Sequence, residues 1–213
     1  MCIRSRIISV CVMIIAVAMF VCSETEPSER PYPVDCYVCR IMKDNTLCVP
    51  KTMEKLEDLS AVIVKGSLLD DAKQKLHFPE VGVVGDGVTV SSFEISKVYK
   101  GNLQIRDKIS IAESYYTFTE NGTQTCYAQG YAPSVAGQKY IFFLTKSPED
   151  NEFLRGTYSP MAKEIGRYPV IDTKDSNRPD IRSMTERDLN LVNTDLSLYQ
   201  EMYQKIIDKY MKE

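Results

Sequence analysis

Val88-Thr-Val-Ser-Ser-Phe-Glu-Ile-Ser-Lys-Val-Tyr99 is the stretch of sequence that decides the fold. Its first two valines share one face of an extended strand, whereas Phe93 and Ile95 share the other. The alternation therefore slips by one residue near Ser91-Ser92, as it does at a β-bulge, and bulges bend the long strands of barrels. The pattern predicts a long, bent barrel strand.

Further short apolar runs, separated by Gly and Pro, flank this strand on both sides. They are typical of strands and lie at 61–69, 108–112, 123–128, 139–145, 156–158 and 168–171. Gly66 interrupts the first run and indicates a bend or bulge. Before them, Thr52 can cap a short helix, since Met53, Leu56 and Leu59 recur at helical spacing. The chain therefore reads as mostly β, a small antiparallel barrel of five to six strands with a short N-terminal helix.

The C-terminal segment has a different periodicity. Ser183-Met-Thr-Glu186 has the form of a capping box, and the stripe after it fits one face of a helix that a break near Asn193-Thr194 can interrupt. We expect this helical extension, 175–213, to pack on the barrel with Leu196 and Ile206 buried; a coiled-coil seam is the alternative. The stripe consists of Leu189, Val192, Leu196, Tyr199, Tyr203, Ile206 and Tyr210.

The N-terminus predicts secretion. Arg4 and Arg6 precede an apolar stretch at 7–21, and Val21-Cys-Ser23 offers a signal peptidase site, so residues 1–23 are read as a signal peptide. About 15 apolar residues fall short of the roughly 20 that a membrane span needs, and Val21 stands where a lipoprotein signal requires a small residue before its lipidated cysteine. The mature chain then carries 24 basic and 29 acidic residues, a net charge of −5, and begins with a flexible lead at 24–35.

Four cysteines remain after that cleavage: Cys36, Cys39, Cys48 and Cys126. An even number in an oxidising compartment predicts two disulfides, with three possible connectivities. A zinc ribbon needs two Cys-x-x-Cys pairs and only one is present, while a thioredoxin-like pair should follow a strand of a βαβ unit. We therefore expect structural disulfides and no metal.

Composition narrows the function classes further. The net charge of −3 argues against nucleic-acid binding. The chain has a single histidine, His77, which excludes a metal site built on several imidazoles, and a Ser-His-Asp triad would have to use His77 itself. Glu113 and Glu120 read as carboxylates of a solvated loop, and no nucleophile–base pair is recognisable. We expect no enzyme activity and no cofactor. Asn121-Gly-Thr123 is a candidate glycosylation sequon in the same loop.

Taken in order, these features resemble a known family. The Cys36-x-x-Cys39 pair and the short helix are followed by Asp58-Leu-Ser-Ala-Val-Ile-Val-Lys-Gly66 and by Phe93-Glu-Ile-Ser-Lys-Val-Tyr-Lys-Gly101. Cys126 and Ala136-Gly-Gln-Lys-Tyr-Ile-Phe-Phe-Leu144 come next. Over residues 36–171 the chain resembles the inhibitory domain of the tissue inhibitors of metalloproteinases, within the netrin-like group. The resemblance implies a five-stranded OB barrel, here placed at 36–174.

The resemblance also implies an inhibitory edge at Cys36, Tyr37, Val38 and Cys39. In that family the first cysteine begins the mature chain and chelates the protease zinc; here Cys36 would chelate, Tyr37 would enter the substrate pocket and Cys126 would tether the segment. We expect Cys126 to pair with Cys36 or Cys39, and Cys48 with the other.

The sequence departs from the family pattern at this edge. The motif is Cys-x-x-Cys in place of Cys-x-Cys, cysteine partners expected after the last strands are missing, and 12 residues separate Cys36 from the expected cleavage site. A peptide nitrogen cannot chelate as a free amine does. We therefore expect a secreted, non-enzymatic module that binds an extracellular protein without chelating zinc. A metalloproteinase inhibitor processed at Cys36 is the first alternative and a secreted enzyme the second.

Overall fold

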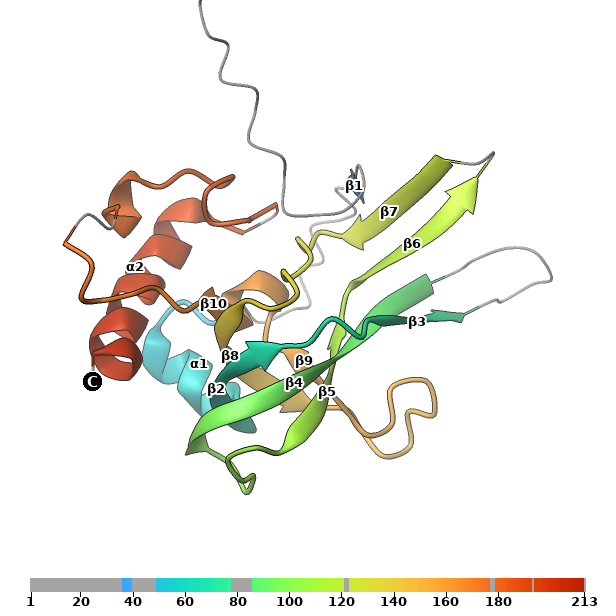
Figure 1. The fold of residues 1–213 in the computed structure, drawn as a ribbon, viewed down its shortest axis with the longest axis horizontal. Coiled ribbons are helices and arrows are strands. Elements are labelled where there is room, and N and C mark those ends of the chain that lie inside the picture. Colours follow the sequence, from blue (N-terminus) through green and yellow to red (C-terminus); the bar gives the residue numbers. More distant parts are fainter. Residues whose placement is uncertain are drawn as a thin grey trace, which may run out of the picture.

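A computed structural model describes residues 36–39, 49–77, 86–120, 123–176, 179–192 and 194–212. Its centre is a closed barrel of five strands, β8-β2-β4-β5-β9, in which β8 also pairs with β9 (Figure 1). The strands are β2 (Val62–Leu68), β4 (Asp86–Lys100), β5 (Lys108–Glu113), β8 (Lys139–Lys146) and β9 (Thr157–Pro160). This confirms the prediction of a small, mostly β barrel.

One pair of neighbouring barrel strands, β5 and β9, is parallel, and the other four pairs are antiparallel. The sequence predicted antiparallel pairing throughout. A closed ring with an odd number of strands cannot alternate direction at every step, so one parallel pair is geometrically required. The order of first, second, third, fifth and fourth strand around the ring is OB-like.

The barrel strands bury one face in the barrel interior. Where the helices pack, the outer face of the barrel is buried as well. The interior contains Val62, Val64, Leu68, Phe93, Ile95, Ile109, Ile111, Tyr140, Phe142 and Leu144. Ile141 and Phe143 of β8 point the other way, into a second apolar cluster shared with the helices. Because both faces of β8 are covered, its sequence is a nearly continuous apolar run.

The predicted slip at Ser91-Ser92 is wrong. Alternate residues of β4 stay buried from Thr89 through Ile95, and β4 pairs with β5 without a register shift from Thr89 to Glu94. Buried Thr89 satisfies its hydroxyl by donating to the Tyr115 carbonyl oxygen at 2.8 Å, so polar residues occupy inward positions that hydropathy alone assigns to solvent. The register shifts lie against β2 instead, one of them at Lys65/Gly66, which confirms the irregularity predicted at Gly66.

Among the described residues, five strands lie outside the closed ring. β3 (Lys73–His77) pairs with the first part of β4, and β10 (Arg167–Pro169) pairs with β8. A separate sheet has the order β1-β7-β6, formed by β1 (Cys36–Cys39), β7 (Thr123–Gln129) and β6 (Tyr115–Glu120). β3 and β6 were not predicted. β3 is a polar strand, whereas β6, Tyr115-Tyr-Thr-Phe-Thr-Glu120, was missed although Tyr116 and Phe118 alternate with threonines as they do in a strand.

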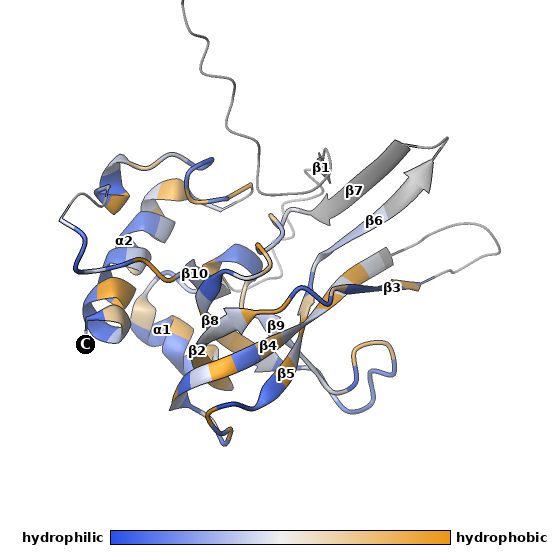
Figure 2. Cartoon of the chain, in the orientation of Figure 1, coloured by the Kyte–Doolittle hydropathy of each residue, from blue (hydrophilic) through white to orange (hydrophobic). Residues whose placement is uncertain are grey.

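The helices cover one side of the barrel. They are α1 (Met53–Leu59), the short 3-10 turns η1 (Lys163–Gly166) and η2 (Ile181–Ser183), and α2 (Leu196–Ile206), which continues as the π-helical turn η3 (Ile207–Met211). Thr52 caps α1 as predicted, its hydroxyl accepting from the Lys55 amide at 3.2 Å. Figure 2 shows polar and apolar residues mixed on α1 and α2, as expected of helices with one face on the barrel.

The C-terminal stripe packs within the chain, on the barrel, as predicted, with Tyr199, Tyr203 and Ile206 buried. Two details were wrong. Leu196 is only half-buried, and Asp195, whose carboxylate accepts from the Leu198 amide at 2.9 Å, caps the helix in place of Ser183. The Ser183 hydroxyl instead donates to the Asp180 carbonyl within η2, and turns occupy most of 184–192.

Candidate functional site

The predicted inhibitory edge occupies the outer strand of the three-stranded sheet. β1 runs parallel to β7, and the register places Cys36 opposite Cys126 and Tyr37 opposite Tyr127. β7 turns back antiparallel on β6, so that among the described residues β1 lies at one end of the order β1-β7-β6. An outer strand presents its second row of backbone groups to a partner chain, and this is the geometry used in strand addition.

The β6–β7 hairpin that carries β1 is fixed to the barrel at its base. Only Ser114 separates β6 from β5, and the Thr89 hydroxyl of β4 bonds the Tyr115 carbonyl. The Tyr116 ring is buried against Gly87, where a Cβ atom would lie 2.7 Å from a ring carbon. The absence of a side chain at Gly87 therefore lets the hairpin approach β4 closely. The β6–β7 hairpin and the β3–β4 pair lie side by side in Figure 1.

The β1–β7 register distinguishes the two predicted cysteine pairings. Neighbouring strands lie about 4.7–4.9 Å apart, within the roughly 4.4–6.8 Å between Cα atoms of bridged cysteines. Cys39 is opposite Gln129, three positions from Cys126 and therefore roughly 10 Å away along the strand. The register favours Cys36 as the partner of Cys126, and the disulfide itself stays a prediction. Cys48 and the candidate glycosylation site Asn121 lie outside the described residues.

A cluster of charged side chains lies buried at one end of the barrel, and the sequence did not indicate it. Arg167, on β10, is 1% exposed. Its guanidinium donates to the carbonyl oxygens of Ala132 and Asn190, the latter at 2.8 Å, and its Cζ lies 4.9 Å from the centre of the Tyr131 ring. One arginine thus joins β10 to the loop after β7 and to the segment before α2.

Two carboxylates complete this buried cluster. Glu164 accepts from the amides of Ala132 and Val192 at 2.9 and 3.0 Å and from the Thr194 hydroxyl at 2.6 Å. Glu113, at the end of β5, is fully buried and accepts from the Tyr131 and Ser134 hydroxyls. The prediction of Glu113 as a solvated loop carboxylate is therefore wrong, since the barrel continues to this residue. Of Glu120 the structure describes only its place in β6.

The electrostatics of the cluster follow from its burial. Desolvation raises the pKa of Glu113 against the opposing effects of Arg167 and the Ser134 hydrogen bond. Burial, reinforced by Glu113, likewise raises the pKa of Tyr131. Glu113 Oε2 and Arg167 Nε are buried without a hydrogen-bond partner among the described residues. The cluster closes the end of the barrel and joins β10, the loop after β7 and the segment before α2, so its role is structural.

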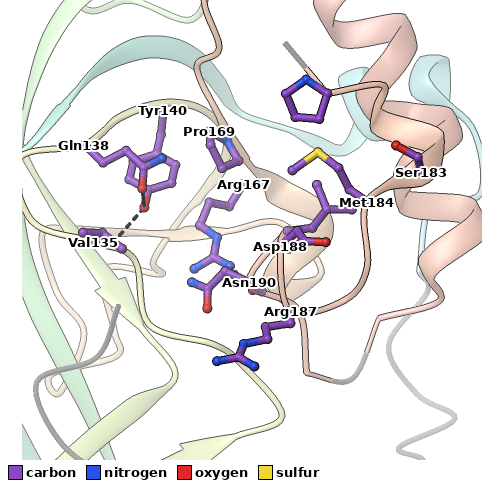
Figure 3. A pocket seen from close by; sticks show the side chains of 12 residues that line it. Val135, Gln138, Tyr140, Arg167, Pro169, Ser183, Met184, Arg187, Asp188 and Asn190 are labelled. Carbon is purple, nitrogen blue, oxygen red and sulfur yellow. Dashed lines mark hydrogen bonds between the residues drawn. The ribbon is translucent and has the colours of Figure 1, made fainter. Parts of the chain in front are cut away.

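Beside Arg167 lies a pocket of about 620 Å³ between the barrel end and the segment before α2. Figure 3 shows Gln138 and Tyr140 on one side of it and Met184 on the other, with Arg167 between them. The Tyr140 hydroxyl is occupied, because it accepts from the Val135 amide and donates to Gln138 Oε1, both at 2.8 Å. The Arg167 guanidinium likewise donates to protein groups, namely the Ala132 and Asn190 carbonyl oxygens and the Ser134 hydroxyl.

Other predicted features lie apart from both sites. His77 is exposed on β3, its ring in edge-to-face contact with Phe153 at 6.2 Å between centroids. Among the described residues, no three histidine, cysteine or carboxylate side chains gather as a metal site would require. Within the same residues, no helix combines the length and the apolar character needed to cross a membrane.

Comparison with known proteins assigns no family to this chain. No protein-family model matches it, and no curated protein matches it either. The OB-like barrel and the edge strand β1 of the neighbouring sheet are therefore the basis for any functional conclusion.

Proposed function

We propose that this chain is a secreted, non-enzymatic module of the kind found in the tissue inhibitors of metalloproteinases and netrin-like proteins. It binds an extracellular protein through the edge strand β1, which β7 supports. The observation that carries the proposal is the position of β1 at the outside of the β1-β7-β6 sheet, on a hairpin anchored to the barrel. Such an edge can hydrogen-bond an extended segment of a partner, while its side chains provide specificity.

The proposal excludes family-type zinc chelation for the chain that begins after the signal peptide. Cys36 would then be preceded by 12 residues, so its nitrogen would be a peptide nitrogen without a basic lone pair. An open zinc position needs a ligand that can donate electrons, and the preceding chain would occupy the protease cleft. A metalloproteinase inhibitor that acts through Cys36 after further processing is the second candidate, supported by the register of Cys36 with Cys126.

A catalytic role for the buried carboxylates is less well supported than a structural one. Glu164 and Glu113 both accept hydrogen bonds that join distant segments of the chain. A general acid or base must reach a substrate proton directly or through one water molecule, and both residues are fully buried.

Titration of a matrix metalloproteinase tests the proposal. Three forms of the protein are compared: one beginning at Glu24, one beginning at Cys36, and one beginning with a single alanine added before Cys36. We expect the Glu24 and alanine-extended forms to leave the protease active. Inhibition by the Cys36 form alone would support the processed-inhibitor alternative as a latent activity.

Tight inhibition by the Glu24 form that persists when Cys36 and Tyr37 are replaced would contradict the proposed edge, because another surface would then be responsible. Tight inhibition by the Glu24 form that is lost with these replacements would show that the edge enters the protease cleft despite the preceding chain. The exclusion of active-site binding would then be wrong.

A further inference from the structure

The pocket beside Arg167 contains two hydrogen-bond donors that the fold does not use. Gln138 and Arg167 both line this pocket. The Tyr140 hydroxyl donates to the amide oxygen of Gln138, whereas the amide nitrogen, Nε2, has no hydrogen-bond partner among the described residues. Arg167 Nε is buried and, within the same residues, also lacks a partner. Buried donors are almost always bonded in folded proteins, so an unbonded one in the wall of a pocket points to a ligand or an ordered water there.

The backbone holds Gln138 in place as firmly as its side chain does. Its carbonyl oxygen accepts from the Leu68 amide at 3.1 Å, and its own amide donates to the Val135 carbonyl oxygen at 3.2 Å. The turn that brings it there contains Gly137, whose φ of +80° glycine adopts without strain. The Nε2 donor is therefore preorganised, and a ligand that accepts from it has to order little of the protein.

The side chains that line the pocket carry more positive than negative charge. Its cations are Arg167 and Arg187, and its anion is Asp188. The Asp188 carboxylate is engaged by the protein, since its Oδ2 accepts from the amide and the hydroxyl of Thr185, both at 2.7 Å. Figure 3 shows Gln138 across the pocket from Asp188. An anion beside Gln138 therefore lies away from that carboxylate, and a charged acceptor makes a stronger hydrogen bond than a neutral one.

The buried carboxylates behind the pocket balance this charge only in part. Neither Glu113 nor Glu164 belongs to the described residues that line it. Glu164 accepts from the amides of Ala132 and Val192, and desolvation raises the pKa of Glu113, which favours its neutral form. Arg167 therefore acts on the pocket as a cation.

Much of the remaining lining is apolar. Val135, Pro169, Met184 and Leu189 surround the polar groups of a pocket of about 620 Å³. A pocket of roughly 300–1,000 Å³ with apolar walls and a few fixed polar groups is typical of sites for small ligands. This lining suits a carboxylate on a short aliphatic stem, because the stem can pack on the apolar walls while the carboxylate meets the donors.

We propose that this pocket binds a carboxylate carried on a short aliphatic stem, whether in a small free acid or in a glutamate side chain of another protein. The carboxylate accepts from Gln138 Nε2, and Arg167 and Arg187 supply the positive charge around it. The inference concerns a different surface from β1 and does not rest on the partner binding proposed for that edge.

Calorimetric titration of the chain that begins at Glu24 with glutarate tests the inference, and glutaramide, a neutral isostere, is the matched ligand. We expect one-to-one binding of glutarate, and binding of glutaramide at least about tenfold weaker. Gln138→Glu keeps an acceptor for Tyr140 but replaces the donor with a charged oxygen, so it should weaken glutarate binding about tenfold or more. Gln104→Glu makes the same change of charge at an exposed position in the turn before β5 and should bind like the wild type.

Arg187→Gln is an independent variant that keeps the proposal testable if Gln138→Glu does not fold. Arg187 is exposed, so its replacement should leave the fold intact while it weakens glutarate binding about threefold or more. The matched control is Arg155→Gln, at an exposed arginine in the loop after β8, and it should bind like the wild type.

The tripeptide acetyl-Gly-Glu-Gly-amide and its glutamine counterpart distinguish the two sources of the carboxylate. Binding of glutarate alone would assign the pocket to a free acid, and binding of the glutamate peptide alone would assign it to a protein side chain. Equal affinity for glutarate and glutaramide, unchanged affinity in the folded pocket variants, or binding of neither glutarate nor the peptide would overturn the proposal. None of these measurements involves β1 or a protease, so the two proposals can fail independently.

Discussion

Replacing Ile206 with alanine tests whether the C-terminal helix is an integral part of the folded domain. Its side chain is fully buried in the cluster between α2, α1 and the outer face of β8. Replacing it with alanine removes buried methyl and methylene groups and leaves a cavity, a change that costs about 2–5 kcal/mol at sites of this kind. Because the surrounding cluster is large and aromatic, with the hydroxyls of Tyr199 and Tyr203 bonded to the Arg167 and Pro169 carbonyl oxygens, it can collapse little, and we expect a cost of about 3 kcal/mol.

A loss of about 3 kcal/mol corresponds to a fall in melting temperature of roughly 6–12 °C for a domain of this size. Urea unfolding followed by circular dichroism should show a lower midpoint for Ile206→Ala with an unchanged slope. Leu196→Ala is the matched control, because Leu196 belongs to the same stripe at the start of α2 but is only half-buried, and should cost distinctly less. An unchanged midpoint for Ile206→Ala would refute the docked helix. Loss of self-association in Leu196→Ala without loss of stability would favour a coiled-coil seam instead.

Three other predictions follow from single contacts. Because burial raises the pKa of Glu113 above its ordinary value of 4.5, the folded chain retains a proton that the unfolded chain releases; the associated stability is present at low pH and is lost as the pH rises above 4.5. Glu113→Gln should therefore flatten this part of the stability–pH profile measured by urea unfolding, and a profile like that of the wild type would contradict the argument. Gly66→Ala would place a Cβ atom 2.1 Å from the Glu94 carbonyl oxygen, so it should destabilise the barrel by at least about 3 kcal/mol or prevent folding, as measured by the urea midpoint and soluble yield. Peptide mapping without reduction should recover Cys36 linked to Cys126, and a Cys39 link to Cys126 would show that the β1 register differs in solution.

The edge proposed for partner binding was only partly predictable from the sequence. The sequence indicated that the Cys-x-x-Cys pair and Cys126 form disulfides, but nothing in their spacing indicates a parallel strand pairing across about 90 positions. The strand β6, which supports that pairing, has a strand-like alternation of Tyr116 and Phe118 with threonines, but nothing in that pattern indicates which strands it pairs with. The buried Arg167–Glu113–Glu164 cluster was invisible, because charged residues are ordinarily exposed and only contacts between distant segments can satisfy them inside a protein.

Local patterns in the sequence were sufficient where a residue's role depends on its near neighbours. The Thr52 cap, the irregularity at Gly66 and the apolar run of β8 were all predicted correctly, because capping, steric freedom and burial on both faces leave signatures within a few positions. Tertiary structure alone decided which face of β4 turns inward and where α2 begins. Thr89 is buried because the Tyr115 carbonyl lies within reach, and Asp195 caps the helix because the preceding segment is held by Glu164. In both cases the deciding contact is a hydrogen bond between residues far apart in the chain, from Thr89 to Tyr115 and from Val192 to Glu164, and local periodicity does not reveal such contacts.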